Sequence, residues 1–244
     1  MKKRVLIATG VALAIVAAGC SDDSSSDTTI PAVLPEFGGA EDFVEGIDNP
    51  YWPAVPGSRW VYEGVDEGEV EVIEVTVLDD TRDIGGITAT IIRDTVEIDG
   101  ELAEDTYDWY GQDTEGNVWY LGEDSTEFEN GEAVSTAGSW ETGVDGAVPG
   151  IIMYADLESQ VGEAYFQEFY EGEAVDKAVI EETGATVTVA AGTFTDVVVI
   201  REWNPLESGK FENKYLAPGV GVVLEEVVEG GEGRVELISF EPGG

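Results

Sequence analysis

Apolar and polar residues alternate along most of the chain after residue 58, a pattern typical of half-buried β-strands. In residues 69–78 acidic residues alternate with Val or Ile, and the alternation changes phase at Val72 and Ile73. Such a phase change predicts a β-bulge at that point. No segment shows a sustained helical period of ten or more residues, so the sequence predicts an all-β fold.

Turn signals separate these segments at short intervals. Asp99-Gly100 and Asn130-Gly131 fit two-residue hairpin turns, and Gly85-Gly86 marks another turn. The spacing predicts an antiparallel meander of about eleven strands. We expect the meander to curve into an open or half barrel, with a β-sandwich as the alternative. Residues 138–161 have little periodicity, which predicts a long loop across one end of the sheet.

The first twenty residues differ in kind from the rest of the chain. Three basic residues at positions 2–4 precede the apolar residues 5–18, a stretch too short to span about 30 Å of hydrocarbon but typical of a secretory signal. Small residues then lead into Cys20, the only cysteine. This arrangement resembles the lipobox of bacterial lipoproteins, although Ala17 stands where a larger aliphatic residue is usual. The alternative is an ordinary signal followed by an incidental cysteine.

The lipobox resemblance implies a chain of three parts. Residues 1–19 would be a lipoprotein signal peptide, and residues 20–47 a lipidated Cys20 followed by a flexible, Ser-rich and acidic tether. Residues 48–244 would form a single β domain. Acylation of the Cys20 thiol and amine would hold the protein on a membrane, because each buried methylene contributes about 0.8 kcal/mol. The expected location is therefore the extracytoplasmic cell envelope.

Charge narrows the range of partners. The chain has 52 acidic residues, 11 Lys and Arg, no His and a net charge of −41. Long-range attraction to nucleic acids is excluded by the sign of this charge. Asp113, Glu115 and Asn117 surround Gly116 and offer oxygen donors for Ca²⁺, but Gly116 comes too early for an EF-hand loop. A hairpin turn without metal is the competing interpretation, and no other cofactor is expected.

The residue types also exclude several kinds of catalytic site. The absence of His excludes a Ser-His-Asp triad and a His-based metal site, and no phosphate-binding or dinucleotide-binding motif occurs. A pair of carboxylates could serve a glycoside hydrolase, but with 52 acidic residues the sequence singles out no pair. We therefore expect a protein that is not an enzyme.

Aromatic residues offer the clearest candidates for ligand contact. Trp109, Tyr110, Trp119 and Tyr120 lie on two strands that a single turn connects. Such residues could line a ligand-binding surface, or they could pack the sheet as cross-strand pairs.

Three segments resemble parts of exported bacterial lipoproteins of unassigned function: PGSRWVYEG (56–64), AAGTFTDVVVIREW (190–203) and YLAPGVGVVLEE (215–226). This resemblance implies an antiparallel, open-barrel-like sheet and carries no activity. We expect a monomeric binding module, attached to a membrane through its lipid anchor, for an apolar ligand or an envelope protein. The alternatives are an acidic surface-coat lipoprotein that holds divalent cations diffusely and a carboxylate-based hydrolase.

Overall fold

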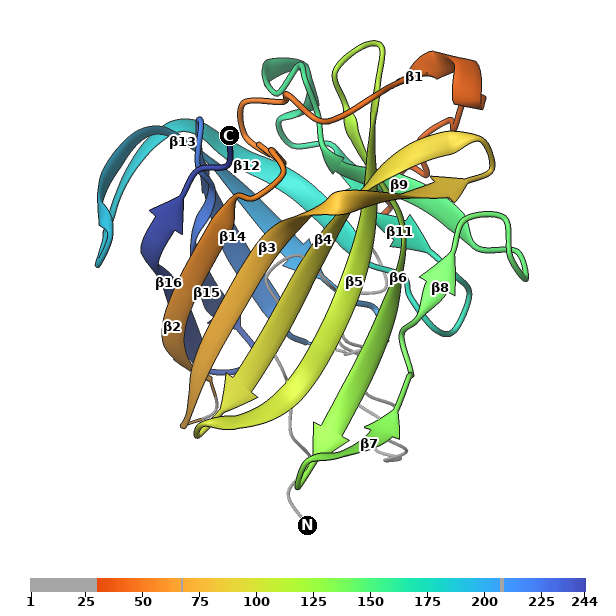
Figure 1. Ribbon diagram of the computed structural model, residues 1–244. Coiled ribbons are helices and arrows are strands. Elements are labelled where there is room, and N and C mark those ends of the chain that lie inside the picture. Colours follow the sequence, from red (N-terminus) through yellow and green to blue (C-terminus); the bar gives the residue numbers. More distant parts are fainter. Residues whose placement is uncertain (1–29, 67, 207–208) are drawn as a thin grey trace.

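One antiparallel sheet, curved into a nearly closed barrel, makes up most of the molecule (Figure 1). The computed structural model describes residues 30–66, 68–206 and 209–244. Along the sheet the strands follow the order β10-β12-β13-β14-β15-β16-β2-β3-β4-β5-β6-β9-β11. The two strands at the ends of this path, β10 and β11, are separated in the chain by Gln167 alone, so the two edges of the sheet meet.

The strands have the following bounds: β1 (Phe43–Val44), β2 (Arg59–Asp66), β3 (Glu69–Ile84), β4 (Ile87–Ile98), β5 (Glu101–Asp113), β6 (Val118–Glu129), β7 (Glu132–Ser135), β8 (Trp140–Glu141), β9 (Val148–Met153), β10 (Ala164–Phe166), β11 (Glu168–Phe169), β12 (Lys177–Val189), β13 (Gly192–Trp203), β14 (Phe211–Ala217), β15 (Gly221–Glu229) and β16 (Gly233–Glu241). Two short 3₁₀-helices, η2 (Ala40–Asp42) and η3 (Glu158–Gln160), accompany them. In the described part of the chain no helix is long and apolar enough to cross a membrane.

The predicted fold class is confirmed. The sheet is an antiparallel meander that closes into a barrel, with more strands than the expected eleven, and the alternative sandwich does not form. The hairpin turns lie where the sequence predicts them. Asp99 and Gly100 have φ angles of 52° and 81°, and Asn130 and Gly131 have φ angles of 53° and 79°. Two successive positive φ angles are the signature of the tight turn that suits the twist of a hairpin.

The β-bulge predicted at Val72 and Ile73 is wrong. Strands β2 and β3 pair without interruption from Arg59↔Thr76 to Asp66↔Glu69, and the register of β3 first shifts after Val77. The alternation changes phase for another reason, because Glu71 is buried on the same face as Ile73. An acidic residue therefore occupies an inward-facing position at which the alternation predicts an apolar residue.

The loop predicted for residues 138–161 is corrected in part. This segment contains β8, β9 and η3, and β9 pairs with both β6 and β11. Three successive apolar residues of β9, Ile151 to Met153, are buried, so the strand shows no alternation that a sequence pattern could reveal. Gly150 lies so close to the backbone of Phe166 that a Cβ there would meet the carbonyl oxygen at 2.2 Å.

Residues 30–47, assigned to the tether, pack on the outside of the barrel. Strand β1 pairs with β5, and the ring of Phe37 meets that of Trp119 edge-on at 5.3 Å between centroids. The folded part therefore begins before Asp48, because Phe37 and Phe43 cover apolar side chains on the sheet. The predicted signal peptide, the lipidation site Cys20 and residues 20–29 lie outside the described residues.

Two apolar clusters stabilise the barrel. The larger cluster fills the interior and includes residues from β2, β3, β4, β13 and β15. The smaller cluster lies on the outer face of the sheet, where its buried members are Ile84, Ile87, Ala89, Trp109, Trp119, Leu121 and Ile151. The sheet is thus buried on both faces in the region of the β5–β6 hairpin.

Candidate functional site

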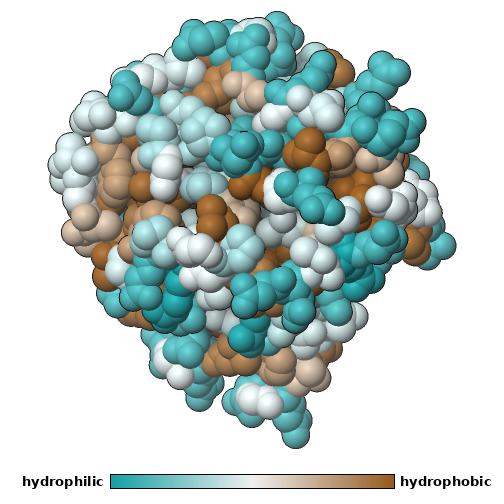
Figure 2. All heavy atoms as spheres, turned by 45° about the horizontal axis from the view of Figure 1, so that its top comes forward, coloured by the Kyte–Doolittle hydropathy of each residue, from teal (hydrophilic) through white to brown (hydrophobic). Residues whose placement is uncertain are grey.

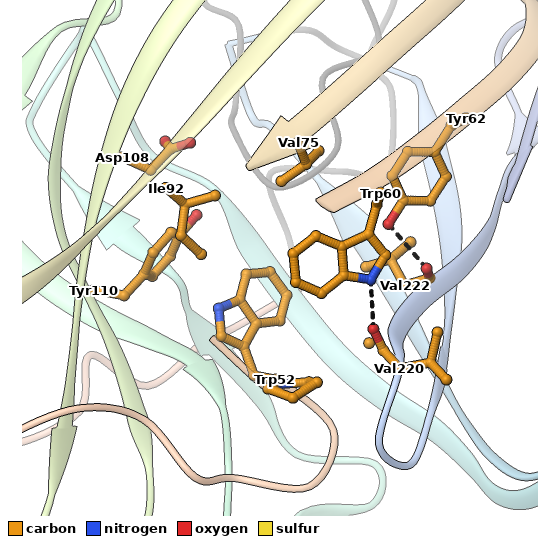
Figure 3. A pocket seen from close by; sticks show the side chains of 11 residues that line it. Trp52, Trp60, Tyr62, Val75, Ile92, Asp108, Tyr110, Val220 and Val222 are labelled. Atoms are coloured by element: carbon orange, nitrogen blue, oxygen red, sulfur yellow. Dashed lines mark hydrogen bonds between the residues drawn. The ribbon is translucent and has the colours of Figure 1, made fainter. Parts of the chain in front are cut away.

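A pocket opens among the start of β2, the start of β15 and the segment that precedes β2 (Figure 3). Its walls leave about 450 Å³ between them, the mouth included. The lining residues are predominantly aromatic and aliphatic: Trp52, Pro53, Trp60, Tyr62, Val75, Ile92, Asp108, Tyr110, Val220, Gly221 and Val222. The enclosed space is about 50 Å³.

Hydrogen bonds hold the segment before β2 across this end of the barrel. The side-chain carbonyl of Gln112 accepts from the backbone N–H groups of Asp48 and Asn49, both at 2.9 Å. The N–H of Gly219 donates to the carbonyl of Pro50 at 2.7 Å. These bonds tie the segment to β5 and to the β14–β15 turn, so Trp52 is positioned by the backbone on both sides of the pocket.

The aromatic walls are held by their polar atoms. Trp60 Nε1 donates to the carbonyl oxygen of Val220 at 2.7 Å, and the Tyr62 hydroxyl donates to the carbonyl oxygen of Val222 at 3.0 Å (Figure 3). The rings of Trp52 and Tyr110 lie 5.4 Å apart. The Nε1 atom of Trp52 is buried and has no hydrogen-bond partner among the described residues. A buried indole N–H without an acceptor is uncommon and calls for an explanation.

A single carboxyl group, that of Asp108, lines the pocket. Its side chain is 2% exposed and lies beside Ile92 and Tyr110 in Figure 3. The Tyr120 hydroxyl donates to Asp108 Oδ1 at 2.7 Å. Burial raises the pKa of Asp108 well above its ordinary value, and the hydrogen bond from Tyr120 partly opposes this shift.

Asp108 belongs to a larger group of buried acids inside the barrel. The fully buried members of this acid cluster are Glu71, Asp94, Glu104, Asp108, Glu123, Glu168 and Glu225. Asp108 and Glu123 are directly opposite each other on β5 and β6, an arrangement that is unfavourable when both are charged. Neither oxygen of Glu123 has a hydrogen-bond partner among the described residues.

The environment of the acid cluster therefore favours the protonated form of its carboxyl groups. Burial raises the pKa of Glu104 to about 7, and burial together with Glu168 and Asp108 raises the pKa of Glu123 well above its ordinary value. Lys214 is a buried cation inside the barrel, and its Nζ lies 2.6 Å from an oxygen of Glu202. The acids of the cluster outnumber this lysine among the described residues, and low dielectric favours the protonated form of a buried carboxyl group.

The structure divides the four predicted ligand-contacting aromatics between two faces of the sheet. Trp109 and Trp119 belong to the outer cluster, where Trp119 Nε1 donates to Asp113 at 2.8 Å. Tyr110 and Tyr120 face the interior and stack on each other, with centroids 4.9 Å apart and ring planes at 18°. Of the four, Tyr110 lines the pocket.

The residues predicted to bind calcium form a tight turn. Asp113 Oδ1 accepts from the backbone N–H groups of Glu115 and Asn117, both at 2.9 Å, and Oδ2 accepts from the Asn117 side chain at 2.9 Å. Together with the bond from Trp119, both Asp113 oxygens are engaged within the hairpin. Across the described ranges no group of three or more His, Cys, Asp or Glu is arranged to hold a metal ion.

The sequence did not single out Trp52, Trp60, Tyr62 or Asp108 as site residues. The signal for Trp60 and Tyr62 was present as a W-x-Y pair that opens β2, since alternate residues share one face of a strand. Asp108 could have been found from the same rule, because it alternates with Thr106 and Tyr110, which also face the barrel interior. No local rule brings Trp52 to these side chains, because its position depends on long-range hydrogen bonds.

Comparisons with known proteins leave the chain without an assigned family. No family model matches it, and no curated protein matches it. Two solved structures are similar. One, from Bacteroides fragilis, is a "putative exported protein with YmcC-like fold", with a TM-score of 0.47 and 13% identity over 80% of this chain and all of that one. The other, a "putative lipoprotein" from Parabacteroides distasonis, has a TM-score of 0.36 and 14% identity over 79% of this chain and 99% of that one. Likenesses this weak do not decide the function.

Proposed function

We propose that this protein is an exported, lipid-anchored binding module that takes a small, mainly apolar ligand into the pocket at the Trp52 end of its barrel, without catalysing a reaction. The observation that carries the proposal is the pocket itself. Its walls include Trp52, Trp60, Tyr62 and Tyr110, and hydrogen bonds to backbone carbonyls hold Trp60 and Tyr62 in place. A preformed, mostly apolar concavity with a few polar groups is the usual form of a ligand site.

The energetics favour an aromatic or aliphatic ligand. Rigid aromatic side chains give large contact areas, and burial of apolar surface contributes about 25 cal/mol per Å². Trp52 Nε1, which has no partner among the described residues, supplies an unused donor in the pocket lining. A ligand that carries an acceptor near this atom would satisfy it and gain specificity.

The buried acids support binding over hydrolysis. A carboxylate-based hydrolase needs two carboxyl groups that both reach the substrate. Asp108 lines the pocket, whereas its cross-strand neighbour Glu123 is 1% exposed and does not. The acidic surface coat remains the second candidate, because the surface in Figure 2 shows many hydrophilic side chains among the apolar ones and the net charge is −41.

The pocket is tested with N-phenyl-1-naphthylamine, a neutral apolar dye whose fluorescence rises on burial. We expect saturable binding of one dye per chain. Val75→Phe adds a ring inside the pocket and should weaken dye binding at least tenfold. Val70→Phe makes the same substitution on the same strand, at a residue that is 52% exposed, and should leave binding unchanged. Absence of saturable binding, or equal effects of the two variants, would contradict the proposal.

The lipid anchor is tested separately at Cys20. In a bacterial host fed radiolabelled palmitate, the wild-type chain should carry label and sediment with membranes. Cys20→Ser should carry no label and should appear in the soluble exported fraction. A wild-type chain without label would instead favour an ordinary signal sequence.

A further inference from the structure

We propose that the ligand of this pocket is an amphipathic organic cation, whose apolar body lies against the aromatic walls and whose ammonium group lies beside Asp108. This inference rests on the proposed binding function and names the chemical class of its ligand. Two features carry it: the aromatic composition of the walls and the position of a carboxyl group among them.

The walls suit a cation as well as an apolar body. Two of the lining residues are Trp and two are Tyr, and the faces of these rings attract an ammonium group electrostatically. Such contacts are strongest where water is excluded. Trp60 is 5% exposed and Tyr62 is 3% exposed, so their rings lie in a dry environment.

Asp108 supplies a carboxyl group at the right place. When an ammonium group lies beside it, the carboxyl proton is released to solvent and the carboxylate pairs with the cation. Asp108 is the acidic residue among the described side chains that line the pocket, and no Lys or Arg lines it. The Tyr120 hydroxyl donates a hydrogen bond to Asp108 Oδ1 and so holds the carboxyl group in place. An ammonium ion can exchange its water for this carboxylate and the surrounding rings, whereas a neutral ligand gains only the apolar contacts.

The acidic residues in the rest of the barrel select against anions. Asp94 and Glu104 lie close enough to Asp108 to add to the burial that raises its pKa, and Asp108 and Glu104 likewise add to the raised pKa of Glu123. The buried Lys214 is engaged by Glu202 at 2.6 Å, so it offers no free cation to a carboxylate ligand. A fatty-acid or phosphate headgroup would therefore find no free cation at the floor of the pocket, whereas an ammonium group favours the ionised form of Asp108 and pairs with it.

The test uses three ligands that share a phenyl group on a two-carbon chain and differ in the charge of the end group. They are 2-phenylethylammonium, neutral 2-phenylethanol and anionic 3-phenylpropionate, titrated into the intact purified protein by isothermal titration calorimetry at pH 8. We expect the cation to bind at least tenfold more tightly than the alcohol and the anion not to bind. Asp108→Asn should reduce affinity for the cation at least tenfold and should lower the ratio of cation affinity to alcohol affinity.

Asp124→Asn is the matched control, because Asp124 is an exposed acid on β6 and loses the same charge. It should leave the affinity for the cation unchanged. If Asp108→Asn does not fold, Trp52→Leu provides an independent variant that should weaken binding of the cation more than binding of the alcohol. Equal affinities for the cation and the alcohol would overturn the cation inference and keep the binding function. Absence of binding by all three ligands, together with failure of the dye test, would overturn both.

Discussion

The two faces of the β5–β6 hairpin are both buried, yet they have opposite chemistry. On the outer face Trp109, Trp119 and Leu121 form a dry apolar cluster beneath Phe37 and Phe43. On the inner face the same two strands carry Asp108 and Glu123 directly opposite each other. Two acids thus face the barrel interior beside Tyr110 and Tyr120, which belong to the apolar cluster there.

This difference shows which face stabilises the fold and which face costs stability. Burial of a large apolar side chain contributes about 1.5–3 kcal/mol, so the outer face stabilises the hairpin. Burial of a carboxyl group without partners costs several kcal/mol unless the group is protonated. An inner face of Leu and Val would be more stable, and the presence of acids there fits the proposed role of Asp108 in ligand binding.

The largest expected effect is on the outer face. Trp119→Ala removes a side chain that is 4% exposed, its contact with Phe37 and its hydrogen bond to Asp113. We expect the free energy of unfolding to fall by about 3–5 kcal/mol, measured by urea denaturation. Val134→Ala, at a position 52% exposed on β7, should change it by less than about 0.5 kcal/mol. A loss below about 1 kcal/mol for Trp119→Ala would show that the outer cluster is not a main source of stability.

The inner face should make stability depend on pH. The pKa of Glu104 is raised from 4.5 to about 7 in the folded chain, so the folded state binds its proton more tightly than the unfolded state. The resulting stability is fully present below pH 4.5 and is lost as the pH rises through 7, by about 3 kcal/mol for this one group. We expect urea midpoints to fall between pH 5 and pH 8. Glu104→Gln should flatten this slope, and a midpoint that rises with pH would contradict the assignment.

Glu123 gives a more local test of the same face. Glu123→Gln keeps the shape of the side chain and removes its ability to ionise. We expect an increase of about 1–2 kcal/mol in the free energy of unfolding at pH 8 and little change at pH 5, where the native carboxyl group is already protonated. Equal destabilisation at both pH values would mean that Glu123 has a structural role that charge does not explain.

The smallest effect is expected at an ion pair on the exterior. Arg59 and Glu74 are hydrogen-bonded between β2 and β3, and this bond lowers the pKa of Glu74. Both side chains are substantially exposed, so Glu74→Gln should cost less than about 1 kcal/mol at pH 7. The lowered pKa means that this contribution is present above the ordinary pKa and is lost as the pH falls. A decrease above about 2 kcal/mol in the free energy of unfolding would mean that this exterior ion pair affects stability as strongly as the buried acids do.

The turns, which depend on local sequence, were predicted correctly. The acidic residues that face the barrel interior were missed. Two hairpin turns were predicted from Asp-Gly and Asn-Gly pairs, and both have the expected positive φ angles. The bulge assigned to Val72 and Ile73 failed because Glu71 points into the barrel, and a pattern rule assumes that inward positions are apolar. The same assumption hid Asp108. An acidic residue at a position where the alternation expects an apolar one therefore has two explanations. Either the strand contains a bulge, or the acid is buried.

The candidate site was less predictable than the fold. Tyr110 was among the predicted aromatics, but its neighbours Trp109 and Trp119 face the other side of the sheet. Alternation along β5 separates Trp109 from Tyr110 by simple geometry, so this part could have been resolved from the sequence. The position of Trp52 could not, because it depends on Gln112 and on the β14–β15 turn, which are distant in the chain.

The most direct test of the central claim is a crystal structure of the protein with 2-phenylethylammonium. We expect the phenyl ring to lie against Trp52 and Trp60 and the nitrogen to lie about 3 Å from an oxygen of Asp108. An empty pocket at saturating ligand, or a ligand whose nitrogen points out of the mouth away from Asp108, would contradict it.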